Sequence, residues 1–226
     1  MKIEDIAKAA TGPVWFQLYV QRDRGFTREL VQRAEAAGCR ALCVTVDSPV
    51  FSVRNREDRS RAELPPRALP NLKGNDYLDP TVTWKDIDWL RGFAKTPVVL
   101  KGILNPDDAA IAVKAGVAGI IVSNHGGRNL DTVPATIDAL PRVAETVEGQ
   151  IPVLVDGGIR RGTDVVKALA RGATAVQIGR PYLWGLGVAG AAGVTRVVEI
   201  LRRELEVTMM LVGRPTLASI DKSVLW

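Results

Sequence analysis

The sequence of 226 residues has little cysteine and histidine, with two residues of the first and one of the second. Cys39 and Cys43 match neither the spacing of a zinc pair nor a disulfide framework, and their apolar neighbours predict core positions in a cytosolic protein. No apolar stretch approaches the roughly 20 residues of a membrane span, and the N-terminus lacks the layout of a signal peptide. We therefore expect no metal site and no membrane span.

A large charge of one sign is also missing, because 30 basic and 25 acidic residues leave a formal charge of +5. Four arginines lie between Arg54 and Arg61, but Glu57 and Asp58 interrupt them and no aromatic residues alternate with them. This pattern argues against nucleic-acid binding. The hydrophobic fraction of 46% and the charged fraction of 24% are ordinary for a globular protein. The length suits a single domain over residues 1–226.

Short apolar runs alternate with helical patterns along most of the chain, which is typical of parallel βα units. Several helices begin with a capping signal such as Asn105-Pro106 and end at a glycine. The predicted strands are Val14–Val20, Ala41–Asp47, Pro97–Lys101, Gly119–Asn124, Ile151–Asp156 and Ala175–Gly179. The predicted helices are Ile3–Ala10, Thr27–Ala37, Trp84–Ala94, Pro106–Ala115, Pro134–Val147, Thr163–Ala170 and Val188–Leu211.

Polar side chains gather where these strands end. In a closed barrel all such ends meet on one face, whereas in an open doubly wound sheet they spread along an edge. Contributions from every strand favour the barrel. The long segment 48–83, rich in proline and arginine, predicts a lid or substrate loop over that face, and Val188–Leu211 is expected to close the barrel wall.

His125 lies in the loop Ser-Asn-His-Gly-Gly-Arg that ends at Arg128. Histidine suits proton transfer near neutral pH, and an arginine three residues on can bind an anion. The plainer alternative is a surface histidine in a glycine-rich turn. Asp47 could orient His125 in a catalytic dyad or could cap the following loop. Lys101 is a Schiff-base nucleophile, a charge partner for a cofactor or a rim residue, and the sequence leaves these open.

Two consecutive strands end in glycine-arginine loops, at 156–162 and at 178–181. Glycines there allow backbone amides to approach a phosphate, and barrels often bind phosphate after the last two strands. The alternative is a pair of tight turns with solvated arginines. We predict phosphate binding.

These motifs together resemble the FMN-dependent 2-hydroxy acid oxidoreductases, the family of glycolate and lactate oxidases and of mandelate dehydrogenases. The resemblance covers nearly the whole chain. It rests on six blocks in the family's order, which are Phe16–Tyr19, Thr45–Asp47, Leu100–Gly102, Ser123–Arg128, Asp156–Gly162 and Ile178–Pro181.

The resemblance implies oxidation of an (S)-2-hydroxy acid to a 2-oxo acid with FMN as cofactor. His125 would take the hydroxyl proton while the α-hydrogen leaves to flavin N5, and Asp47 would hold the imidazolium. Tyr19 would bind the reacting oxygen, and Arg54 and Arg128 the substrate carboxylate. The residues implied for FMN are Lys101 near N1 and O2, Gln17, Thr45 and Ser123 at the ring, Asp156 at the ribityl chain, and Gly157, Gly158, Arg160, Gly179 and Arg180 toward the phosphate.

The chain departs from the family in strand number, because six strands stand where the family's (β/α)8 TIM barrel has eight. The missing βα units are the first two, which leaves an incomplete barrel with two exposed edges. We therefore expect a homo-oligomer or a complementing fragment. Two other functions stay open: a non-catalytic flavin- or phosphate-binding fragment, and a different FMN or phosphate-binding barrel such as an isomerase. The carboxylate clamp argues against the isomerase.

Overall fold

The computed structural model describes residues 1–53, 55, 59, 71–72 and 78–225. Within them, one parallel sheet of six strands follows the sequence order from β1 to β6. Each strand pairs with the next in parallel, for example Gln17 with Cys43 and Thr45 with Lys101. The strands are β1 (Trp15–Leu18), β2 (Ala41–Thr45), β3 (Val98–Ile103), β4 (Gly119–Val122), β5 (Val153–Val155) and β6 (Ala175–Val176).

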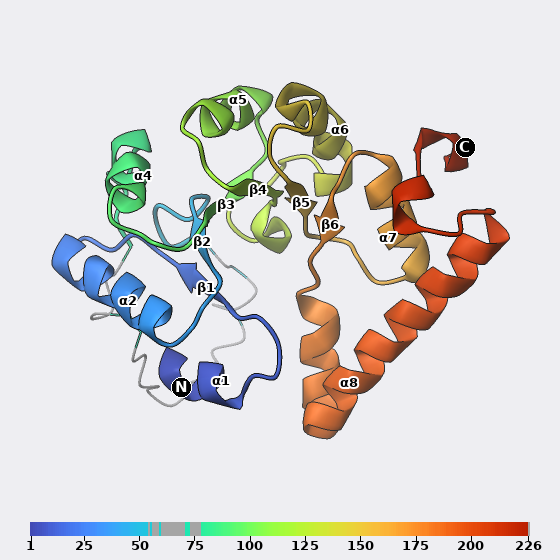
Figure 1. Cartoon of the computed structure of the whole chain (residues 1–226), viewed down its shortest axis with the longest axis horizontal. Coiled ribbons are helices and arrows are strands. Elements are labelled where there is room, and N and C mark those ends of the chain that lie inside the picture. Colours follow the sequence, from blue (N-terminus) through green and yellow to red (C-terminus); the bar gives the residue numbers. More distant parts are fainter. Residues whose placement is uncertain (54, 56–58, 60–70, 73–77, 226) are drawn as a thin grey trace.

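Helices follow the strands and cover the convex side of the curved sheet (Figure 1). The N-terminal helix α1 (Ile3–Ala9) packs beside α2, and the Glu4 side chain pairs with Arg33 at 2.7 Å. The other helices are α2 (Arg24–Ala36), α4 (Trp84–Arg91), α5 (Pro106–Lys114), α6 (Thr136–Val147), α7 (Gly162–Ala170) and α8 (Arg180–Leu211), with short 3-10 turns at η1 (His125–Gly127), η2 (Leu217–Ser219) and η3 (Lys222–Val224).

The two faces of the sheet carry different cores. The helix-facing core is large and apolar and includes Leu42, Leu100 and Ile120, each almost fully buried. The inner face holds a separate small cluster of alternate residues, one from each central strand: Cys43, Val99, Ile121 and Leu154. Alternate strand residues point to opposite faces, so the inner cluster is the floor of a barrel interior.

The barrel is incomplete, as the strand count predicts. In the described chain β1 pairs with β2 alone and β6 with β5 alone, so one edge of each remains open. Figure 1 shows a wide gap between β1 and the last helix, α8. The molecule therefore consists of six βα units of an incomplete (β/α)8 barrel.

Most strands end earlier in the structure than the sequence predicts. The ladders stop at Thr45, Val122 and Val155, because the polar residues that follow turn away into loops. Strand β3 differs, since it continues past Lys101 to Ile103 with a shift in register at this point. The loop expected over 48–83 lies largely outside the described residues. Leu78 forms an isolated antiparallel bridge with Gln21, beyond the end of β1.

The last helix differs most from expectation. It begins at Arg180 rather than at Val188, and Ala189 and Gly190 have non-helical backbone angles, so two helical legs meet at a kink. The legs approach very closely, because a Cβ on Gly193 would lie 1.9 Å from the carbonyl oxygen of Gly185. The second leg packs against α7 and does not close the barrel wall.

The apolar character of α8 also corrects the expectation that no segment reaches the length of a membrane span. By length and composition this helix of 32 residues could cross a bilayer, and only 11% of its most apolar window is buried. The kink at Ala189 and Gly190 breaks it into two legs, so it is not one straight rod.

Candidate active site

His125 and Asp47 meet at the carboxyl end of the sheet. His125 follows β4 and Asp47 follows β2, and His125 Nδ1 lies 2.9 Å from Asp47 Oδ1. Both side chains are partly shielded, with 25% and 14% of their surface exposed. Because Nδ1 is held by the carboxylate, Nε2 is the ring nitrogen left to accept a proton.

The backbone at His125 is unusual for a residue with a side chain. Its φ is +56°, in the left-handed region, and the two glycines that follow also have positive φ. A conformation of this kind costs about 1–3 kcal/mol and concentrates at functional sites. The His125 amide donates to Ser123 Oγ at 3.1 Å, which fixes the turn to the end of β4.

A row of hydrogen-bonded side chains lies beside this pair, at the carboxyl ends of the strands. We call this end of the sheet the rim. Lys101 Nζ donates to Ser123 Oγ at 2.9 Å, and Ser123 Oγ donates to Asp156 Oδ2 at 2.9 Å. The ammonium also lies 3.3 Å from the Asp156 carboxylate. Three neighbouring strands, β3, β4 and β5, thus place a cation, a hydroxyl and an anion in one row.

Gln17 and Thr45 continue the rim on the other side. Gln17 Nε2 donates to Thr45 Oγ1 at 2.9 Å, and Thr45 is paired in register with Lys101. The expected ring contacts Gln17, Thr45 and Ser123 therefore lie along neighbouring strand ends.

The expected substrate residues are only partly brought together. Tyr19 and His125 line the same small cavity of about 40 Å³. Arg128 is exposed at the end of the turn η1. Arg54 lies outside the described residues, so its place in a carboxylate clamp stays a prediction.

The glycine-arginine loops, where a phosphate site is predicted, make contacts of their own. The amides of Arg160 and Arg161 both donate to the Asp164 carboxylate, as in the start of a capped helix, so they are not available to a phosphate. The Arg160 guanidinium lies 5.5 Å from the Trp184 ring centroid, which brings the loop after β5 to the first leg of α8. Arg180 begins that helix and donates to the Gly126 carbonyl at 3.3 Å.

Glycine is required at two positions for different reasons. Gly102 has φ +112°, and a Cβ there would lie 2.5 Å from the Asp47 Cβ, so only glycine lets Asp47 take its place. Gly157 has φ +86°, and a Cβ there would lie 3.0 Å from Thr136 Oγ1. Gly158 and Gly179 have open space where a side chain would begin.

Three residues of the site were not singled out from the sequence. Gly102 stands in one of the motif blocks, where its link to Asp47 is invisible. Ser48 Oγ lies 3.2 Å from His125 Nδ1, and Asn129 Nδ2 donates to Ser48 Oγ and to the Asp47 carbonyl. The nearness of Asn129 to His125 in the chain was the only available signal.

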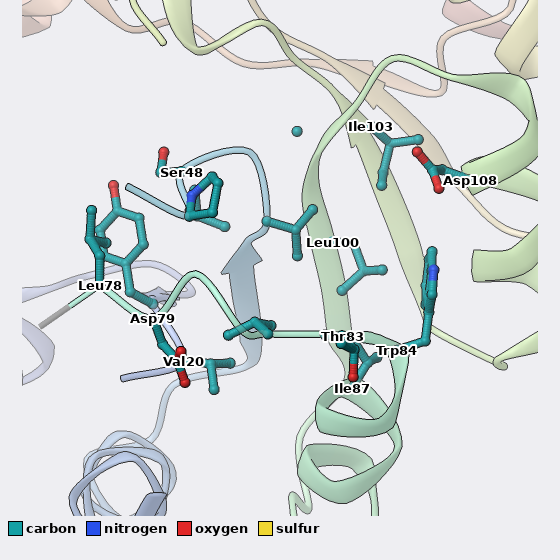
Figure 2. A pocket seen from close by; sticks show the side chains of 16 residues that line it. Val20, Ser48, Leu78, Asp79, Thr83, Trp84, Ile87, Leu100, Ile103 and Asp108 are labelled. Atoms are coloured by element: carbon teal, nitrogen blue, oxygen red, sulfur yellow. The ribbon is translucent and has the colours of Figure 1, made fainter. Parts of the chain in front are cut away.

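A larger cavity of about 370 Å³ adjoins the small one and shares Tyr19 and Ser48 with it (Figure 2). Leu100 and Ile103 line it from β3, and Thr83, Trp84 and Ile87 line it from the start of α4. The cavity therefore extends from the candidate site toward the helix-facing core, to which Leu100, Ile103 and Ile87 belong.

Cys43 lies beneath the site in the inner cluster, and Cys39 lies in the helix-facing core. Both thiols are free and buried, which confirms the prediction of core positions. Burial raises the pKa of the Cys43 thiol to about 11, although the nearby Lys101 ammonium opposes this rise. The thiol is therefore neutral and a poor nucleophile at physiological pH.

The rim keeps acceptors that a bound molecule could satisfy. Within the described chain, Asp47 Oδ2 and Asp156 Oδ1 are buried and have no hydrogen-bond partner. Buried acceptors of this kind are costly unless a donor reaches them. No cluster of three histidine, cysteine, aspartate or glutamate residues suited to a metal occurs among the described residues. Each of the two free oxygens can accept a hydrogen bond from a hydroxyl group of a bound molecule.

Comparison with known proteins points to one family. The model of the FMN-dependent dehydrogenases matches residues 1–226. An L-lactate oxidase of Nostoc sp. is 50% identical over 231 residues, covering 93% of this chain and 63% of that protein. A 2-hydroxyacid oxidase of Dictyostelium discoideum is 46% identical, covering 99% of this chain and 62% of that protein.

Solved structures agree with this match. A mandelate oxidase with (S)-2-phenylpropionate superposes with a TM-score of 0.91 at 43% identity, covering 97% of this chain and 64% of that one. A mandelate oxidase variant with a C4a-OH-FMN adduct gives the same score. The chain spans less than two thirds of the length of these relatives. It belongs to the family of FMN-dependent dehydrogenases, and FMN is the cofactor of that family.

Proposed function

We propose that this chain forms the FMN- and substrate-binding part of an oxidoreductase that converts an (S)-2-hydroxy acid into a 2-oxo acid. The observation that carries the proposal is the His125–Asp47 pair at 2.9 Å beside the Lys101–Ser123–Asp156 row. A proton acceptor and a cationic rim face one concave side of the sheet. The 2-hydroxyacid, lactate and mandelate oxidases to which the chain is similar support this reading.

The side chains of the rim offer charges and hydrogen-bonding groups that suit FMN. When bound, FMN supplies an acceptor for the hydrogen and the electron pair that leave the substrate carbon. Bound beside Lys101, the reduced ring would be stabilised by the positive charge of the ammonium group. The free Oδ1 of Asp156 can accept from a hydroxyl of the ribityl chain, and Arg180 at the start of α8 offers its charge and a helix N-terminus to the phosphate. Gln17, Thr45, Ser123, Gly157, Gly158, Arg160 and Gly179 complete the proposed contacts.

The proton chemistry follows from the histidine pair. We propose that His125 Nε2 accepts the hydroxyl proton of the substrate and that Asp47 stabilises the imidazolium. Tyr19, which lines the same small cavity, donates to the reacting oxygen. Arg128 binds the substrate carboxylate, and Arg54 is proposed as its partner.

A second candidate function is non-catalytic binding of flavin or phosphate. It is favoured by the open edges of β1 and β6, which leave one side of the site without a wall in the described chain. Under this alternative FMN binds but no 2-oxo acid forms. We also propose a cytosolic location, which the two free buried thiols support.

The proposal is tested by measuring FMN binding and 2-oxo acid formation with the same purified protein. The purified chain is titrated with FMN and, in parallel, with riboflavin, which lacks the phosphate. We expect saturable binding that is tighter for FMN, and a 2-oxo acid from at least one of glycolate, (S)-lactate and (S)-mandelate. FMN binding without product supports the non-catalytic alternative, and failure to bind FMN excludes both.

A further inference from the structure

We propose that Ser48 and Asn129 act together as positioning residues that set how strongly the Nδ1 proton of His125 is bound to Asp47. This inference deepens the proposed function and rests on it, because the proton acceptor there is His125 Nε2. The pair acts through Asp47 and does not need to touch substrate.

The four side chains form one connected cluster. Asn129 Nδ2 lies 2.8 Å from the Asp47 carbonyl oxygen and also donates to Ser48 Oγ. Ser48 Oγ lies 3.3 Å from Asp47 Oδ1 and 3.2 Å from His125 Nδ1. Asp47, Ser48 and Asn129 are all partly buried, so water competes weakly for these contacts.

The hydrogen atoms of the cluster can be assigned by counting donors. The two hydrogens of Asn129 Nδ2 go to the Asp47 carbonyl and to Ser48 Oγ, so Ser48 accepts from Asn129. Its own hydroxyl hydrogen can then go to Asp47 Oδ1 or to His125 Nδ1.

The charge of Asp47 decides between these two arrangements. If Ser48 donates to Nδ1, the ring proton sits on Nε2 and the Asp47 side chain loses both donors at Oδ1. Since Oδ2 already has no partner in the described chain, a shielded carboxylate would be left without any hydrogen bond. If Ser48 donates to Asp47, Oδ1 accepts from both Ser48 and His125 Nδ1, and Nε2 is free to take a proton.

Asn129 supports this arrangement because its amide fills one of the two acceptor positions of Ser48 Oγ, which makes that oxygen a weaker competitor for the Nδ1 hydrogen. Without Asn129, both lone pairs of the Ser48 oxygen are available 3.2 Å from Nδ1, and the Nδ1 hydrogen is shared more evenly between Asp47 and Ser48. The ring then loses its single orientation toward the substrate. Ser48 alone has the opposite effect, because its hydroxyl draws part of the Asp47 charge away from the imidazole.

The single histidine of the chain makes a direct test possible. Nitrogen-15 and proton NMR of the full-length labelled chain, under conditions where the ring is neutral, reads the proton on each ring nitrogen without background. We expect a proton on Nδ1 and none on Nε2. The measurement needs neither FMN nor substrate, so its outcome is separate from that of the proposed function.

The variants are expected to shift the Nδ1 proton resonance in opposite directions. Ser48→Ala should move it downfield, because Asp47 Oδ1 then accepts from His125 alone. Asn129→Leu should move it upfield, because the bond is shared with Ser48. Ser48→Thr, which keeps the hydroxyl, should match the parent chain. In the Ser48→Ala background, Asn129→Leu should add little, since its effect passes through Ser48.

A proton on Nε2 in the parent chain would overturn the inference, as would equal shifts in Ser48→Ala and Ser48→Thr. Circular dichroism and the unfolding midpoint check that each variant is folded. If Asn129→Leu does not fold, the comparison of Ser48→Ala with Ser48→Thr and with the parent decides the question.

Discussion

At the scale of single residues, His125 is held from two directions. Its backbone lies in the left-handed region with φ +56°, and its ring is tied to Asp47 at 2.9 Å. A non-glycine residue in this conformation persists only where the surrounding structure fixes it. The amide contact to Ser123 and the ring contact to Asp47 provide that support and leave one nitrogen for chemistry.

The first prediction concerns the His125→Ala variant. We expect the rate of flavin reduction by a 2-hydroxy acid to fall by about 10²–10⁴-fold, the usual contribution of a general base. FMN affinity should be nearly unchanged, because the His125 side chain is not among the proposed FMN contacts. Anaerobic stopped-flow measurement gives the rate and a fluorescence titration gives the affinity. A variant that reduces flavin at the parent rate contradicts the assignment of His125 as the base.

The second prediction follows from the buried thiol beneath the site. The pKa of Cys43 is raised to about 11 by burial, from an ordinary value of 9.0, so the unfolded chain loses this proton first as the pH rises. The contribution to stability is complete below pH 9 and is lost between pH 9 and 11. At pH 10 we expect a loss of about 1.4 kcal/mol relative to pH 8 from this group.

Urea unfolding at pH 8 and pH 10 measures this loss. The test compares a Cys39→Ala variant, which retains Cys43, with a variant that also carries Cys43→Ala. Other titrating groups affect both equally, so the difference isolates Cys43. An equal decrease in both variants would show that Cys43 does not titrate as described.

Much of the candidate site could be predicted from residue types and their place after strands. The pairing of Asp47 with His125 followed from two polar residues at the ends of parallel strands, which meet at one edge. Ser48 and Asn129 could not be predicted, because their contact joins two loops whose approach depends on tertiary packing. The bonds from the Arg160 and Arg161 amides to Asp164 could not be predicted either, because they depend on how the loop enters α7, and the phosphate site stays a prediction.

At the scale of elements, the two legs of α8 meet through glycine. Gly185 and Gly193 touch backbone to backbone, and no larger residue fits between them. The sequence suggested one amphipathic helix from Val188, although its charged residues begin only at Arg196. The earlier leg is apolar and largely exposed, with Leu183 at 50% and Trp184 at 53% exposure, so it carries no helical periodicity that a pattern could detect.

The third prediction compares two glycines of α8. Gly193→Ala should lower the free energy of unfolding by about 1–3 kcal/mol, because the added methyl group overpacks the contact with Gly185. Gly187→Ala, where a side chain meets open space, should be neutral or stabilising by up to about 1 kcal/mol. Chemical denaturation of both variants gives the comparison. Equal effects would mean that the two legs do not pack at Gly193.

At the scale of the whole molecule, the sheet has two open edges. Unpaired backbone groups beside an apolar core favour association with another strand. Trp15 on β1 is 42% exposed, and the apolar first leg of α8 faces the same gap. Strand order and the number of βα units could be predicted from the sequence, since each apolar run is separated from the next by a helix.

The fourth prediction is that the chain associates, either with itself or with a chain that supplies further βα units. Sedimentation velocity should give a mass above that of one chain. Trp15→Lys should weaken association because it places a charge beside the open edge, whereas Ile111→Lys on the outer helix α5 should not. A compact and fully active monomer contradicts this prediction.

The most direct test of the central claim is the visible spectrum of the FMN-loaded chain in the absence of oxygen. The account predicts a flavin spectrum that bleaches when an (S)-2-hydroxy acid is added and stays unchanged with the (R) enantiomer. Two results would contradict the account. One is a chain that is colourless after incubation with excess FMN and removal of the free FMN. The other is a bound flavin that no 2-hydroxy acid bleaches.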